Sequence, residues 1–116
     1  MLNPVDNDGL YGDEYSVEET SIIGIGNNVL INFAEMDFGD GAEKITICGR
    51  TPNAINSIQL RYNDENNVQQ TQLIEFPNCD EYKEITFDIL PIKGEKEISF
   101  VFLPGSKFDF KWFKFE

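Results

Sequence analysis

The amino-acid sequence predicts an all-β protein with the architecture of an antiparallel β-sandwich. Apolar and polar residues alternate along most of the chain, which is the pattern of strands that bury one face. Turn-forming residues separate these runs at intervals near the roughly 8 to 12 residues that are typical of sandwiches and barrels. No segment carries apolar residues at helical spacing over the length of a helix. We therefore expect two antiparallel sheets packed face to face.

The alternation defines seven expected strands. Ile45 and Ile47 share one face of the segment 44–50, and Ile58, Leu60 and Tyr62 share one face of the segment 57–62. Further strands are expected at 27–33, 72–76, 82–90, 96–104 and 107–115, with a weaker one at 13–18. Clusters of Gly, Pro, Asn and Asp predict turns at 39–43, 51–54, 63–67, 77–81, 91–95 and 104–106.

The length of 116 residues predicts one domain that is large enough to bury its own core. The start of the chain is rich in Asn, Asp and Gly, so we expect residues 1–12 to form a flexible linker or N-terminal extension. Residues 13–116 are expected to form a single β-sandwich module. No apolar run approaches the roughly 20 residues of a membrane span, and no targeting signal is expected.

The charge of the chain restricts its partners. Nine Lys and Arg residues stand against 21 Asp and Glu residues, which gives a net charge of −12 and a pI near 4.2. Binding to phosphate backbones or anionic membranes requires clustered cations, so nucleic acid and membrane partners are not expected. A neutral ligand, a cation or a protein partner remains open.

The chain lacks the residues that most catalytic sites use. It contains no histidine, which excludes Ser/His and Cys/His systems and removes the commonest metal ligand. Cys48 lies within an expected strand, where a small buried residue is the simplest interpretation. The many carboxylates fall mainly in turns and on polar faces, as expected of a solvated surface. We therefore expect a protein that is not an enzyme.

Aromatic residues are concentrated at the C-terminus. In a regular strand, Phe108, Phe110 and Trp112 would share one face, and Phe113 and Phe115 would share the other. A strand that is apolar on both faces indicates either a bulge near Trp112 or a cover over the second face. Ten of the fifteen aromatic residues are phenylalanine, which favours a buried core over an exposed sugar-stacking surface.

Two segments resemble a known family. "KEISFVFLPGSKFDFKWFKFE" (96–116) resembles the closing strands of family 6 carbohydrate-binding modules and their galactose-binding-like relatives, and "NNVLINFAEMDFGDGAEKITICGR" (27–50) resembles an earlier strand, turn and strand of that family. The combination is also similar to C-terminal accessory domains of bacterial glycoside hydrolase family 2 enzymes, such as β-galactosidases. The resemblance implies a jelly-roll sandwich that binds an oligo- or polysaccharide without cleaving it and that is attached to a glycoside hydrolase catalytic domain.

The resemblance also implies where sugar would bind. The family's polar position on the closing strand falls on Asp109 and its acidic position on Glu18, while the two ring positions fall on Ile23 and Cys79. The candidate carbohydrate-binding residues are Tyr82 and Tyr15 for stacking, and Glu18, Asn27, Asn28 and Asp109 for hydrogen bonding. Lys111 occupies the position of a family calcium ligand, so a structural calcium ion is disfavoured there, and no cofactor is expected.

The absence of rings at Ile23 and Cys79 leaves an alternative open. The chain could be a structural accessory β-sandwich that docks on its parent enzyme's catalytic domain and has lost sugar binding. A carbohydrate-binding module would favour an extracellular location, whereas a part of an intracellular family 2 enzyme would be cytoplasmic. The residues do not identify the sugar or the oligomeric state.

Overall fold

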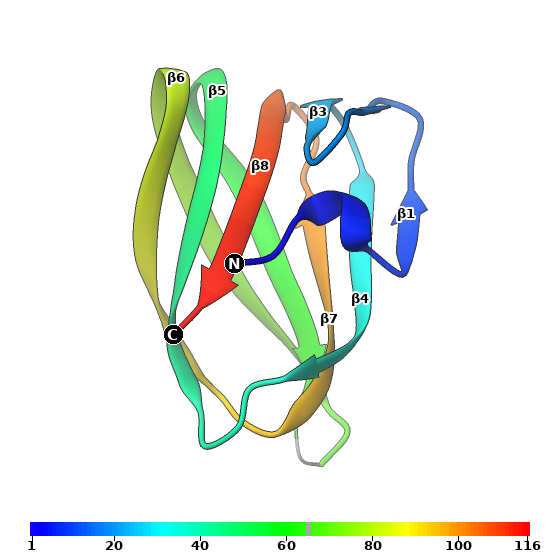
Figure 1. The fold of residues 1–116 in the computed structure, drawn as a ribbon, viewed down its shortest axis with the longest axis vertical. Coiled ribbons are helices and arrows are strands. Elements are labelled where there is room, and N and C mark those ends of the chain that lie inside the picture. The colour runs from blue at the N-terminus through cyan, green and yellow to red at the C-terminus, as the bar shows by residue number, and fades with distance from the viewer. Residues whose placement is uncertain (65) are drawn as a thin grey trace.

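Antiparallel strands make up most of the chain in the computed structural model, which describes residues 1–64 and 66–116 (Figure 1). Glu65, within the expected turn at 63–67, lies outside the described residues. The elements are η1 (Pro4–Asp6), β1 (Gly9–Tyr11), β2 (Ser16–Val17), β3 (Ile22–Ile25), β4 (Val29–Asp37), β5 (Ala42–Asn63), β6 (Gln69–Ile92), β7 (Glu95–Phe102) and β8 (Phe108–Phe115). No helix in the described chain is long and apolar enough to cross a membrane.

The long strand β5 joins the two layers of the fold. Its first half pairs with β8, where Ile47 lies opposite Phe113, and its second half pairs with β7, where Leu60 lies opposite Phe100. Strands β1, β4 and β7 extend one layer and strands β2, β3 and β8 extend the other, while β6 follows β5 through both. The result is a curled antiparallel β-sandwich, which confirms the expected fold class.

At the expected turns 51–54 and 77–81 the chain changes direction as predicted, but the strands do not end there, because these residues remain within β5 and β6. Pro52 and Pro77 lie where each long strand folds back from one layer to the other, since β5 runs antiparallel to β8 in its first half and antiparallel to β7 in its second half. The pairing register of β5 shifts between Gly49 and Thr51 and again between Thr51 and Ile55. Proline cannot donate to a strand ladder, so it is tolerated where the ladder is interrupted. The two bends lie at the upper end of the molecule in Figure 1.

The core lies between the layers and is built largely from phenylalanine. Phe33 of β4 meets Phe113 of β8 with ring centroids 5.1 Å apart, and Phe100 of β7 meets Phe110 of β8 at 5.4 Å. These edge-on contacts between opposing sheets are the favourable geometry for aromatic pairs. Phe100, Phe110 and Phe113 are fully buried. The aromatic tail is therefore mainly core, as its phenylalanine content predicts.

A bulge in β8 explains the two-sided apolar pattern of the tail. Trp112 lies opposite Cys48 while Phe110 lies opposite Gly49, so Lys111 is an extra residue in the ladder. The extra residue resets the alternation, and Phe110 and Phe113 both face the core. Trp112 is only half-buried and falls outside the core cluster, so its expected face, shared with Phe108, is wrong. Of the two alternatives that the sequence left open, a bulge near Trp112 and a cover over the second face, the bulge is present.

The first residues of the chain lie against β8. Leu2 and Phe113 exchange two backbone hydrogen bonds, of 2.7 and 3.0 Å, on the stretch of β8 that follows its pairing with β3. Pro4 is buried, Leu2 and Val5 pack on the core, and β1 pairs with β4. In this position the segment covers part of an edge of β8 that would otherwise be unpaired.

Deleting residues 1–5 tests whether this segment contributes to stability or acts as a linker. We expect the free energy of unfolding to fall by about 2–4 kcal/mol, because two apolar contacts and two backbone hydrogen bonds are lost. Urea denaturation followed by tryptophan fluorescence measures the change, with the single substitution Met1→Ser, at a highly exposed residue, as the control. An unchanged stability after the deletion would identify residues 1–5 as a linker.

Candidate functional site

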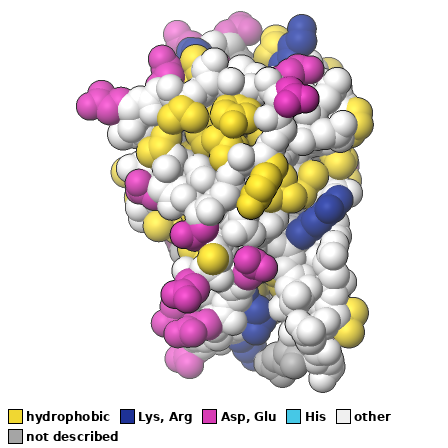
Figure 2. All heavy atoms as spheres, turned by 90° about the vertical axis from the view of Figure 1, so that its right-hand side faces the viewer, with side chains coloured by type: hydrophobic (Ala, Val, Ile, Leu, Met, Phe, Trp, Pro, Cys, Tyr) yellow, Lys and Arg dark blue, Asp and Glu magenta, His cyan; other side chains and the backbone are white. Residues whose placement is uncertain are grey.

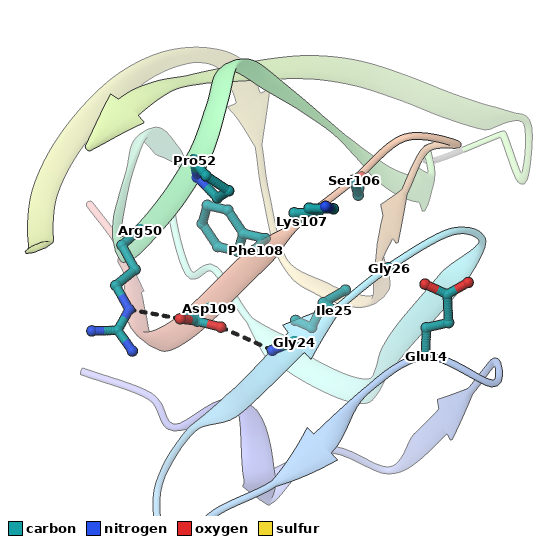
Figure 3. A pocket seen from close by; sticks show the side chains of 10 residues that line it. All are labelled: Glu14, Gly24, Ile25, Gly26, Arg50, Pro52, Ser106, Lys107, Phe108 and Asp109. Atoms are coloured by element: carbon teal, nitrogen blue, oxygen red, sulfur yellow. Dashed lines mark hydrogen bonds and ion pairs between the residues drawn. The ribbon is translucent and has the colours of Figure 1, made fainter. Parts of the chain in front are cut away.

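A cavity of about 370 Å³ lies at the end of the sandwich where β5 bends and β8 begins (Figure 3). Its walls come from β3, the bend of β5 and the first residues of β8, and they include Gly24, Arg50, Pro52, Lys107, Phe108 and Asp109. This volume is at the lower end of the roughly 300–1,000 Å³ typical of small-molecule sites. A smaller hollow of about 170 Å³ adjoins it and is lined by Thr51, Cys79 and Asp80 together with Arg50, Pro52 and Asp109.

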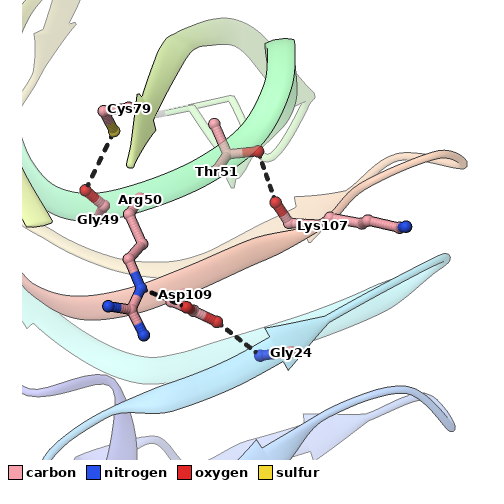
Figure 4. A network of polar contacts seen from close by, with 7 residues as sticks. All are labelled: Gly24, Gly49, Arg50, Thr51, Cys79, Lys107 and Asp109. Atoms are coloured by element: carbon pink, nitrogen blue, oxygen red, sulfur yellow. Dashed lines mark hydrogen bonds and ion pairs between the residues drawn. The ribbon is translucent and has the colours of Figure 1, made fainter. Parts of the chain in front are cut away.

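An ion pair between Arg50 and Asp109 lines both hollows. The two residues lie opposite each other in the β5–β8 ladder, and Arg50 Nε donates to Asp109 Oδ2 at 2.6 Å. The other carboxylate oxygen, Oδ1, accepts a 2.8 Å hydrogen bond from the backbone N–H of Gly24 (Figures 3 and 4). The Arg50 side chain keeps 42% of its surface exposed, whereas that of Asp109 keeps 23%. The carboxylate is therefore held from two sides, while the guanidinium still faces solvent.

Tyr82 lies beside this ion pair, and two cationic side chains lie over its ring. The guanidinium carbon of Arg50 lies 4.5 Å from the centre of the Tyr82 ring, and Lys111 Nζ lies 5.1 Å from it. Both distances are within the range of cation–π contacts. Burial raises the pKa of the Tyr82 hydroxyl, and the negative charge of Asp109 raises it further. The hydroxyl therefore remains protonated at neutral pH and can donate a hydrogen bond.

A buried polar network holds the loop between β7 and β8 against the bend of β5. Asn56 is buried, and its side-chain oxygen accepts from the backbone N–H of Lys107 at 2.9 Å. Its amide nitrogen donates to Ser106 Oγ at 3.4 Å. The hydroxyl of Thr51 donates to the carbonyl of Lys107 at 2.5 Å (Figure 4). Both backbone groups of Lys107 are thus satisfied by β5, which fixes the rim of the cavity.

The structure brings together three of the six candidate binding residues. Asp109 and Tyr82 both lie at Arg50, and the charge of Glu18 contributes to raising the pKa of both Arg50 and Tyr82. Of the two family ring positions, Cys79 lines the smaller hollow and donates to the carbonyl of Gly49 at 3.6 Å (Figure 4). Ile23 is half-buried in β3, beside Gly24.

Asp109 is the candidate residue that lines the cavity, and the other three candidates, Asn27, Asn28 and Tyr15, lie outside both the lining and the group around Arg50. Asn27 uses its side-chain oxygen to accept from the backbone N–H of Gly105, which ties the β3–β4 turn to the β7–β8 turn. Asn28 occupies the left-handed turn position of the same loop, with φ of 55°. Tyr15 is half-buried and packs on the core. Asn27 and Tyr15 thus have structural contacts through their side chains, and Asn28 has a backbone role in the turn.

Sequence reasoning missed Arg50, Lys107 and Pro52, which all line the cavity. One feature of the sequence could have drawn attention to Arg50 and Lys107: cations are scarce, with only nine Lys and Arg residues in the chain. Two of these nine lie at this end of the sandwich, within the cavity wall. The position of Arg50 beside Asp109 could not be predicted from the sequence, since the two residues are separated by 58 others and meet only through strand pairing.

The site offers little for covalent or metal chemistry. Cys48 is buried, and burial raises the pKa of its thiol, so it is not a thiolate nucleophile at neutral pH. Within residues 1–64 and 66–116, no group of three or more Cys, Asp and Glu side chains is arranged to hold a metal ion. The arrangement suits reversible binding through hydrogen bonds, with both donors and acceptors on the cavity wall.

Solved structures similar to this chain include family 6 carbohydrate-binding modules. A module from Clostridium stercorarium in complex with cellobiose is 25% identical, with a TM-score of 0.84 over 99% of this chain and 91% of that one. A β-1,3-glucan binding family 6 module from Bacillus halodurans is 17% identical, with a TM-score of 0.76 over 99% of this chain and 93% of that one. No protein-family model and no curated protein matches the sequence.

A larger enzyme contains a similar region. A glycoside hydrolase family 43 arabinoxylan arabinofuranohydrolase from Bacillus subtilis, solved in complex with cellotetraose, is 20% identical with a TM-score of 0.68. The match covers 82% of this chain and 20% of that one. The chain therefore has the fold of family 6 carbohydrate-binding modules over nearly its whole length, and the expected jelly-roll sandwich is confirmed.

Replacing Asn56 with alanine tests the network that holds the rim of the cavity. The substitution leaves the N–H of Lys107 without its buried acceptor, so we expect the free energy of unfolding to fall by about 1–3 kcal/mol. Chemical denaturation measures the change. Asn3→Ala is the matched control, because the side chain of Asn3 makes no capping hydrogen bond. Equal effects of the two substitutions would contradict a structural role for Asn56.

Proposed function

We propose that this protein is a noncatalytic carbohydrate-binding module and that it binds an oligosaccharide in the cavity beside the Arg50–Asp109 pair. The observation that carries the proposal is a ligand-sized cavity with charged hydrogen-bonding groups on its wall, within a fold that matches sugar-bound modules over 99% of the chain. The module from Clostridium stercorarium, which binds cellobiose in its structure, supports a β-linked oligosaccharide as the first ligand to test.

The groups around the cavity support binding without cleavage. The carboxylate of Asp109 accepts from Arg50 and Gly24, so both of its oxygens are already engaged by protein donors. A glycosidase of the common type needs two carboxyl groups that face the scissile bond from opposite sides. The wall of the cavity contains one other acid, Glu14, which lies against Gly26 on the far side. Sugar hydroxyls can instead accept from Arg50 and donate to the acids.

We also propose that the module is part of a larger parent protein. The resemblance of residues 27–50 and 96–116 to accessory domains supports a place in a bacterial glycoside hydrolase, where the module would hold the enzyme on its substrate. Family 2 enzymes are the proposed parents because the combined motifs are similar to their C-terminal domains.

Docking on a catalytic domain is a second candidate function, and two observations favour it. Tyr82 is covered by Arg50 and Lys111, so part of its surface is unavailable for stacking on a sugar. Hydrophobic side chains also gather in the upper half of the face shown in Figure 2, which is the side of β1 and β3 in Figure 1. Tyr11 of β1 and Val17 of β2 are exposed by 62% and 59%. Exposed apolar surface of this kind suits contact with another domain.

A glycan-array screen of the isolated chain, followed by calorimetry with and without calcium, tests the proposal. We expect a weak but reproducible hit, and we expect Asp109→Ala to lower its affinity at least about tenfold, or about 1.4 kcal/mol, because Arg50 loses its fixed position. Asp88→Ala is the matched control, since Asp88 also pairs with a cation, Lys44, but lies on an exposed stretch of β6.

The outcomes separate the two candidate functions. Full affinity in Asp109→Ala protein would remove this cavity as the binding site. A blank array from protein with a cooperative unfolding transition would favour docking. In that case, charged substitutions at Tyr11 and Val17 should weaken association with the catalytic domain of the parent enzyme, measured by co-purification.

A further inference from the structure

Glu14 is the second acid on the wall of the cavity, and the loop that carries it is tied down. The backbone carbonyl of Glu14 accepts a 2.8 Å hydrogen bond from the N–H of Gly26, which directly follows β3. The next residue in the loop, Tyr15, packs on the core. In the view of Figure 3, Glu14 and Arg50 lie at opposite ends of the cavity wall, with Asp109 between them. The loop therefore presents a carboxylate at the end of the cavity away from the ion pair.

Gly26 provides the surface on which the Glu14 side chain lies. Gly26 is buried, and a Cβ atom at this position would overlap the carboxylate of Glu14 and come within 2.7 Å of its Cβ. The φ angle of Gly26 lies outside the left-handed region, so the backbone does not require glycine here. Gly24 differs, because its φ of 60° favours glycine while its Cβ would meet open space. The lack of a side chain at position 26 is therefore what allows Glu14 to lie against the wall.

The carboxylate of Glu14 is free to accept hydrogen bonds from a ligand, whereas that of Asp109 is already engaged. The two oxygens of Asp109 accept from Arg50 and from the backbone of Gly24. Glu14 is exposed, and none of the ion pairs and hydrogen bonds within residues 1–64 and 66–116 involves its carboxylate. An ionised carboxylate accepts through two oxygens and donates nothing. Of the two acids on the wall, Glu14 is thus the one with acceptor capacity left.

The charges on the wall of the cavity are balanced. Glu14 and Asp109 stand against Arg50 and Lys107, so the wall has no formal net charge and suits an uncharged ligand. Arg50 uses only Nε for Asp109, so its terminal nitrogens retain their N–H groups. Sugar hydroxyls both donate and accept hydrogen bonds. One oligosaccharide can therefore donate to Glu14 at one end of the cavity and accept from Arg50 at the other.

We propose that Glu14 binds a neutral oligosaccharide by accepting hydrogen bonds from two adjacent hydroxyls of one sugar residue, and that Gly26 is the residue that positions Glu14 for this role. Two adjacent hydroxyls suit the two oxygens of a carboxylate, and hydrogen bonds to a charged acceptor are roughly twice as strong as neutral ones. This inference rests on the proposed carbohydrate-binding function.

Titration with cellotetraose, followed by nuclear magnetic resonance, tests the role of Glu14. We expect the backbone amide signals of Glu14 and Gly26 to shift as the sugar is added. Glu14→Ala should weaken binding at least about tenfold, and Glu14→Gln, which keeps the size but loses the charge, should weaken it severalfold. Glu19→Gln is the matched control, because Glu19 is an exposed acid between β2 and β3 outside the cavity lining. It should bind as tightly as the unchanged protein.

Gly26→Ala tests the positioning without removing the carboxylate. The added methyl group must displace Glu14, so we expect a loss of affinity close to that of Glu14→Ala. In Glu14→Ala protein the same glycine substitution should cause little further loss, because no carboxylate remains to be displaced. A cooperative thermal unfolding transition in each variant establishes that it is folded.

The same titration, repeated with the tightest glycan-array ligand, separates the ways in which the inference can fail. Unchanged affinity in Glu14→Ala protein, with binding still weakened by Asp109→Ala, would remove Glu14 from the site while leaving carbohydrate binding intact. A loss in Gly26→Ala protein that adds in full to that of Glu14→Ala would show that Gly26 acts through the loop and not through the carboxylate. No binding of either sugar by folded protein would contradict the proposed function itself.

Discussion

The bend in β5 is the constraint on which the rest of the structure depends. A single strand of 22 residues pairs with β8 in its first half and with β7 in its second half, so the two layers of the sandwich are joined by one continuous backbone. The bend also carries Thr51 and Asn56, which hold Lys107 through both of its backbone groups. The same few residues therefore turn the sheet and shape the rim of the cavity.

The aromatic core transmits this constraint to the second layer. Phe33 and Phe100 of one layer meet Phe110 and Phe113 of the other through edge-on contacts, which require the rings to be placed in register across the interface. The bulge at Lys111 makes that register possible, because it allows two rings three positions apart to face the same side. It also sends Lys111 outward to the ring of Tyr82. The one extra residue, Lys111, thus affects both the packing of the core and the charge around the cavity.

The ion pair of Arg50 and Asp109 gives the cavity its electrostatic character. A carboxylate that is held by a cation and a backbone N–H is a fixed support, whereas a half-exposed guanidinium with unused N–H groups is available to a ligand. Sequence reasoning assigned the ligand-binding role to Asp109, and the geometry makes Arg50 the residue with more to offer. A single strand pairing thereby places Arg50, which the sequence analysis did not name, beside the candidate residue Asp109.

The sequence by itself determined the fold class, the main strands and the burial of the phenylalanine-rich tail, and it narrowed the two-sided pattern of that tail to a bulge near Trp112 or a cover over the second face. These features depend on period-two alternation and on residue type, which are local properties that a short segment displays. Tertiary structure decided that residues 51–54 and 77–81 bend within strands, because a bend and a turn have the same Pro and Asn composition and differ only in what pairs with them. It also decided the cavity, since Arg50, Gly24 and Asp109 come from three strands and become neighbours only when the layers close.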